Sequence, residues 1–134
     1  MLKILIGVVL AAHGIGHSLG LLGMFKVAAV NPTWDDDSWI LTGPVGATAT
    51  QVIGVTLWTV SMVGFVALAA IVFGWLPETW WMPLAVVSSV ASLLGVLLFP
   101  VAFPTFSTIG AVAIDVVVLV AVLGMHWVPS DLAA

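Results

Sequence analysis

The chain has 134 residues, of which 63% are hydrophobic and only 6% are charged, and its mean hydropathy is +1.32. Soluble domains carry roughly 25% charged residues, so this chain cannot cover a surface that faces water. We therefore expect an integral membrane protein. Its two basic residues are too few for the electrostatic footprint of a nucleic-acid-binding protein. It has no cysteine, which excludes disulfides, thiolate metal ligands and thiol catalysis.

The apolar runs of the chain are long and do not alternate with polar residues, which favours helices over barrel strands. About 20 residues are needed to cross a bilayer, and four runs are expected to do so: residues 4–25, 48–75, 82–99 and 105–127. Short turns make the last three spans antiparallel neighbours. The sequence therefore predicts an all-α, antiparallel four-helix membrane bundle that forms one transmembrane domain over residues 1–134.

Residues 27–46 are expected to form the only sizeable loop, with turn signals at Asn31-Pro32 and Gly43-Pro44. The run Asp35–Asp37 must be solvated, and the tryptophans on either side of it, Trp34 and Trp39, suit the membrane interface. This loop is therefore predicted to lie in water at one end of the bundle.

The orientation of the bundle depends on very few charges. Lys3 and Lys26 bracket the first span, so each side of the membrane receives one lysine. The N-terminal amine adds a positive charge to the terminal side, and the positive-inside rule then places both termini in the cytoplasm. We expect a multi-pass protein of the cell membrane with its acidic loop outside.

The first span carries two histidines four residues apart. At 100° per residue they share a helix face with small and apolar residues, and that face comprises Val9, His13, Gly16, His17, Gly20 and Met24. Gly16 and Gly20 have the spacing of small residues at tight helix contacts in membranes, so both are expected to pack against a neighbouring helix. A histidine that faces lipid is costly, so this face should point into the bundle.

The depth of each polar residue predicts two polar layers across the bundle. At 1.5 Å per residue, His13 lies roughly 18 Å, and Asp115 roughly 15 Å, from the same end of the bundle. One residue from each span contributes to the first layer, and three more form a second layer nearer to the acidic loop. The first layer comprises His13, Thr59, Ser88 and Asp115, and the second comprises His17, Thr56 and Ser92.

Asp115 is the only acidic residue inside a predicted span. An intramembrane carboxylate is by default a functional-site hypothesis with a partner to be named. The expected partner is His13, with His17 second, either as an ion pair or through a hydrogen bond from a protonated carboxyl group. His126 lies at the far end of its span beside Trp127 and is expected to be interfacial.

This set of side chains supports several interpretations. In the structural one, His13, His17 and Asp115 join the helices by hydrogen bonds that contribute about 0.6–2 kcal/mol each. In the second, the same three residues supply a His2Asp ligand set for a divalent metal ion, with water in the fourth position. In the third, they form a proton relay or a pocket for a quinone or another small ligand. Haem is less well supported, because His126 lies at the wrong depth to oppose His13.

The opening segment KILIGVVLAAHGIGHSLGLLG resembles the first helix of DoxX-like small four-span membrane proteins, in which a basic residue and an apolar run precede a glycine and then a polar residue. Gly14 and His17 occupy those places here. Many uncharacterised bacterial and archaeal four-span proteins also carry an H-G-x-x-H element of this kind. The resemblance implies the four-span fold and a role as a partner-dependent subunit of a redox-related membrane complex, and it carries over no catalytic residue.

Two functions therefore remain open. One is a small membrane subunit or scaffold that acts within a homo-oligomer or a larger membrane complex. The other is a metal, proton-relay or small-ligand site built on His13, His17 and Asp115. An enzyme that acts on a soluble substrate is not expected, since only one loop of about 20 residues lies outside the membrane.

Overall fold

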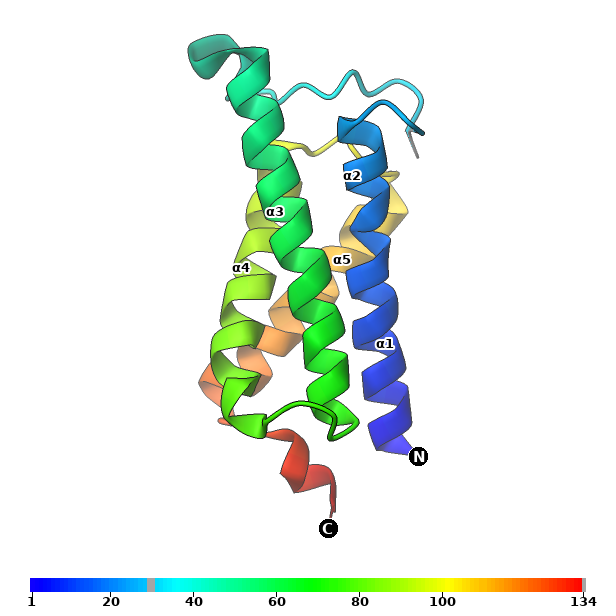
Figure 1. Ribbon diagram of the computed structural model, residues 1–134, viewed down its shortest axis with the longest axis vertical. Coiled ribbons are helices and arrows are strands. Elements are labelled where there is room, and N and C mark those ends of the chain that lie inside the picture. Colours follow the sequence, from blue (N-terminus) through cyan, green and yellow to red (C-terminus); the bar gives the residue numbers. More distant parts are fainter. Residues whose placement is uncertain (29–30, 134) are drawn as a thin grey trace.

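The computed structural model describes residues 1–28 and 31–133 and has four helical rods that run alternately up and down (Figure 1). Each rod is long and apolar enough to cross a membrane. The expected all-α, antiparallel four-helix bundle is thus confirmed, and the two termini lie at the same end of it (Figure 1). The rods are α1 (Leu2–Gly16) with α2 (Ser18–Met24), α3 (Thr42–Val72), α4 (Trp81–Leu98), and α5 (Thr105–Leu119) with the π-helical turn η2 (Val120–Gly124).

The helices begin and end a few residues away from the expected spans. The largest difference is in α3, which begins at Thr42 within the predicted loop. Gly46 interrupts this helix with a φ of 83°, a left-handed conformation that glycine adopts without steric cost. The continuous part of α3 therefore starts close to residue 48, as expected, and the preceding turn belongs to the loop end of the bundle. Residues 29 and 30 of the predicted loop lie outside the described residues.

The rods pack in chain order, with α1 on α3, α3 on α4 and α4 on α5. By contrast, α1 and α5 hardly approach each other along the described backbone, and α5 runs obliquely across the back of the bundle (Figure 1). Two buried apolar clusters fill the interior. One lies nearer to the termini and includes Phe65, Trp81 and Val118. The other lies nearer to the loop and includes Trp58 and Phe99.

Close contact between α1 and α3 depends on Gly14. A Cβ atom added at this glycine would lie 2.9 Å from the Met62 carbonyl oxygen and 3.0 Å from the Val66 backbone nitrogen. The expected packing role of Gly20 fits the structure, because a Cβ there would lie 3.0 Å from Trp58 Nε1. Gly16 does not take this role, since no heavy atom lies within 4 Å of a Cβ added there. The glycine spacing therefore identified a packed helix, but the second packing glycine is Gly14 and not Gly16.

Both ends of the bundle are closed by polar contacts to groups that the helices leave unpaired. At the loop end, the last carbonyls of α4 accept hydrogen bonds from Ser38 Oγ (2.6 Å) and Trp39 Nε1 (2.7 Å), which satisfies acceptors that have no partner within the helix. Trp34 was expected at the interface but is buried against Gly23 and Phe99. At the terminal end, the carboxylate of Glu78 accepts hydrogen bonds from the backbone and side chain of Ser130.

We predict that Gly14→Ala lowers the free energy of unfolding by about 1–3 kcal/mol, because the added methyl group forces two helix backbones apart. Gly16→Ala, two residues along, is the matched control and should leave stability unchanged or slightly higher, since alanine favours helix. Titration of the detergent-solubilised protein with a denaturing detergent, followed by circular dichroism, measures both. Equal losses for the two variants would contradict the assigned contact.

Candidate functional site

The helix formed by α1 and α2 tightens at His17, between its two segments. The His17 N–H donates to the Gly14 carbonyl (3.1 Å), and the Gly20 N–H donates to the His17 carbonyl (3.1 Å), so both bonds span three residues rather than four. Ser18 Oγ also donates to the Ile15 carbonyl (2.6 Å). This local change of helical phase alters the angle between the two histidine side chains relative to a regular helix.

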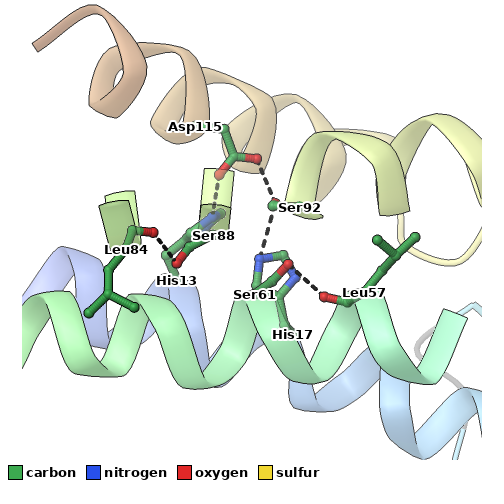
Figure 2. A network of polar contacts seen from close by, with 8 residues as sticks. All are labelled: His13, His17, Leu57, Ser61, Leu84, Ser88, Ser92 and Asp115. Atoms are coloured by element: carbon green, nitrogen blue, oxygen red, sulfur yellow. Dashed lines mark hydrogen bonds and ion pairs between the residues drawn. The ribbon is translucent and has the colours of Figure 1, made fainter. Parts of the chain in front are cut away.

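A chain of four side chains crosses the bundle from α1 to α5 (Figure 2). His13 Nε2 lies 3.0 Å from Asp115 Oδ1. The other carboxyl oxygen, Oδ2, accepts a hydrogen bond of 2.6 Å from Ser92 Oγ. Ser92 Oγ in turn lies 3.2 Å from His17 Nε2. The first span, α4 and α5 are therefore joined by one polar network of His13, Asp115, Ser92 and His17, called the polar network below.

The members of the polar network are buried almost completely. The side chain of Asp115 has no exposed surface, and that of His13 is 5% exposed. Aromatic rings surround the imidazoles: His13 meets Phe65 edge-on at 4.4 Å between ring centres, and His17 stacks on Trp58 at 5.5 Å. The network thus lies where the two apolar clusters meet, and apolar surroundings strengthen its hydrogen bonds.

The structure joins four of the expected polar residues and separates the others. His13 and Asp115 meet as predicted, and His17 and Ser92 join them, which unites parts of the two expected layers. Ser88 is buried but donates to the Leu84 carbonyl of its own helix (Figure 2). Thr59 is exposed on the outer face of α3 and lies outside the network. The expectation of one polar residue from every span in a single layer is therefore not met.

Thr56 of the second layer, and Gln51 on the same helix, also bond elsewhere. Thr56 is exposed and donates to the Val52 carbonyl of its own helix (2.8 Å). Gln51 donates to the Met24 carbonyl (2.8 Å), which ties α3 to the end of α2. Depth along the helix did not predict the hydrogen-bond partner of Thr56, because a hydroxyl group can bond to the preceding turn of its own helix.

A groove runs beside the polar network, between the first span and α5. Its cavity of about 310 Å³ is lined by His13 and His17 at its inner side. Several other lining residues, among them Leu19, Ser107 and Gly110, are exposed on the surface of the bundle. The groove therefore opens sideways, toward the surroundings of the helices, and its polar lining residues are the buried pair of histidines and the exposed Ser107.

One face of α5, which carries three small residues and an isoleucine, forms the opposite wall of this groove. Ser107, Gly110, Ala111 and Ile114 all line the cavity. They recur at the i, i+3, i+4 and i+7 spacing of a single helix face. The small side chains on this face, Ser107, Gly110 and Ala111, are the signal in the sequence that could have indicated the groove. Gly16 and Gly110 border it without any heavy atom within 4 Å of an added Cβ.

A metal centre is not assembled from these residues. Within residues 1–28 and 31–133, no group of three or more His, Asp or Glu side chains is arranged to hold a metal ion. His13 Nε2 and Asp115 Oδ1 face each other across a hydrogen bond instead of a shared ligand position. The predicted His2Asp ligand set of His13, His17 and Asp115 is thus replaced by the polar network.

Comparison of the chain with known protein families, with curated proteins and with solved structures gives no match.

We predict that Asp115→Leu lowers the free energy of unfolding by about 1–3 kcal/mol, because it leaves His13 Nε2 and Ser92 Oγ buried without their common partner. Asp115→Asn should cost less than about 1 kcal/mol, since its amide can still bond both groups. Thr59→Val, on the exposed face of α3, is the control and should be neutral. Unfolding in mixed micelles measures all three, and an equal loss for Asn and Leu would contradict the hydrogen-bonding role.

Proposed function

We propose that this protein binds a lipid-soluble amphiphilic small molecule inside the membrane, with the polar head group of the ligand against His13 and His17. The supporting observation is the groove between the first span and α5, which combines two buried imidazoles with a sideways opening. Ligand pockets are mostly apolar clefts with a few placed polar groups, typically of 300–1,000 Å³. The groove fits that description, and it would admit a ligand from the lipid phase.

A second cavity continues the groove toward the terminal end and suits the apolar part of such a ligand. It measures about 350 Å³, lies between α1 and α5, and is lined only by apolar residues, among them Val9, Ala113 and Val117. Ile114 lines both cavities, so they adjoin each other. An apolar tail in this second cavity would place the head group at the histidines, in the middle of the bundle.

A second candidate function is that of a subunit in a larger membrane complex. It is favoured by α5, which is the least buried of the four candidate spans. The exposed apolar side chains of α5 include Phe106, Ile109 and Val117, and a partner helix could cover them as lipid does. The resemblance of the first span to DoxX-like proteins supports this candidate and extends it to a redox-related prokaryotic complex.

We further propose that the termini lie in the cytoplasm and the acidic loop lies outside. Lys3 supplies a positive charge at the terminal end. At the loop end, Lys26 is paired with Asp36 at 3.2 Å.

Filling the groove should abolish ligand binding without unfolding the bundle. Gly110→Trp places a large side chain at an open groove position, and Thr59→Trp is a matched control on the outer face of α3. With a series of hexyl amphiphiles as probes, native mass spectrometry should detect one bound molecule per chain in the wild type and in Thr59→Trp. Binding should fall at least about tenfold in Gly110→Trp, because the site is sterically filled. Equal binding to all three proteins would contradict the proposed site.

The orientation can be measured directly because the chain has no cysteine of its own. Single cysteines are placed in the acidic loop (Asp37→Cys) and in the turn at the terminal end (Thr79→Cys), both at exposed positions. On intact cells, a membrane-impermeant maleimide should label Asp37→Cys and spare Thr79→Cys until the cells are opened. The reverse pattern would invert the proposed topology.

A further inference from the structure

The polar network uses one nitrogen of each imidazole and leaves the other for a ligand. His13 and His17 both engage through Nε2, while no hydrogen bond involves either Nδ1 atom among the described residues. Since both rings line the groove, the two Nδ1 atoms are the ring nitrogens that can meet a head group. Whether each Nδ1 donates or accepts a hydrogen bond depends on the protons of the network.

The number of protons in the polar network can be counted from its hydrogen bonds. Asp115, Ser92 and the two Nε2 atoms form three consecutive hydrogen bonds, and each of these bonds holds a single proton. The titratable groups at this place are His13 and His17 of the first span and Asp115 of α5. A net charge buried in an apolar bundle is very costly, so the three groups together should be neutral.

Neutrality leaves only a few arrangements, and they share one property. In the first arrangement, Asp115 and His13 form a neutral pair that shares one proton, which lies on either Asp115 Oδ1 or His13 Nε2, and His13 also carries a proton on Nδ1. Ser92 then donates to Asp115 and accepts from His17 Nε2, so His17 Nδ1 is bare. In the second arrangement, the neutral pair is Asp115 and His17, linked through Ser92, so His17 carries a proton on Nδ1 and His13 Nδ1 is bare. In every case one Nδ1 donates and the other accepts.

We infer that the two imidazoles present one hydrogen-bond donor and one acceptor to the head group of the ligand, and that the inner side of the groove therefore selects a hydroxyl-bearing amphiphile, such as a phenol or a long-chain alcohol. This inference rests on the proposed function. A hydroxyl group donates and accepts at once, whereas an ether or a carbonyl only accepts and would leave the bare Nδ1 unpaired. Such an unpaired buried nitrogen lowers affinity by about tenfold.

The same network passes a proton between the two rings. When His13 gives up its Nδ1 proton and His17 gains one, all three bonds reverse direction: Asp115 Oδ1 passes its proton to His13 Nε2, Ser92 passes its proton to Asp115 Oδ2, and His17 Nε2 passes its proton to Ser92. The hydroxyl of the ligand accepts the proton leaving one Nδ1 and donates its own to the other. No net charge is created, and Ser92 is the residue that connects the rings.

Nitrogen-15 NMR of histidine-labelled protein tests the proton arrangement without any ligand. His126→Asn removes the third histidine, at an exposed position with a φ of 53° that asparagine tolerates. In this background, the two remaining rings should together carry one protonated and one bare Nδ1. Asp115→Asn should keep this relation, because its amide supplies one acceptor and one donor to the two sides. Two protonated or two bare Nδ1 atoms would overturn the inference.

Binding of a matched pair of probes tests the selectivity. 4-Hexylphenol and 4-hexylanisole share a tail and differ in the hydroxyl proton, and the phenol should bind about tenfold more tightly. Ser92→Ala disconnects His17 from Asp115 and should bring the two affinities close to equality. Ser88→Ala is the matched control, since this buried serine of the same helix bonds only its own backbone.

The outcomes separate the two proposals. Equal affinities in the wild type, or a preference for the phenol that survives Ser92→Ala, would overturn the selectivity while leaving the site itself intact. If neither probe binds, the proposed function and this selectivity are both overturned. The NMR measurement would still decide whether the network holds one donor and one acceptor.

Discussion

A carboxyl group in the middle of an apolar bundle must have its hydrogen-bonding capacity satisfied by other side chains, since lipid offers none. Asp115 meets this demand with one oxygen toward His13 and the other toward Ser92. These two bonds set how far α5 lies along the bundle relative to the first span and α4. Sliding α5 by one turn would break both bonds, so the rest of the arrangement on this side depends on them.

The groove follows from the same constraint. Along the described backbone α5 packs on α4 and hardly approaches the first span, to which Asp115 joins it by a hydrogen bond with His13. Bonds of this kind hold two helices at a distance that close packing would remove, and the small residues Gly16, Gly110 and Ala111 leave the intervening space open. The structural and ligand-binding interpretations of His13 and Asp115 are therefore compatible, because the bonds that assemble the bundle also hold the site open.

The fold and part of the site could be predicted from the sequence because they depend on one-dimensional quantities. Apolar length determines how many helices cross a membrane, and depth along a helix brought His13 and Asp115 together. The residues whose place was predicted wrongly differ in the direction of their side chains: Thr59 points outward, and Ser88 bonds to its own helix. Gly16 borders the groove instead of a helix, because a glycine pattern does not specify which neighbour each glycine faces. The groove depends on the tilt of α5, which no local pattern encodes.

The weak backbone contact between α5 and the first span has a consequence for biogenesis. The first three rods pack against one another through apolar surfaces, and helices already inserted in a bilayer can associate in this way before the last one arrives. The last rod enters lipid with an acidic side chain that finds partners only on docking. A chain in which α5 has not docked thus exposes the Asp115 carboxyl group to lipid without these hydrogen bonds, so docking of the last rod is the step that satisfies this group.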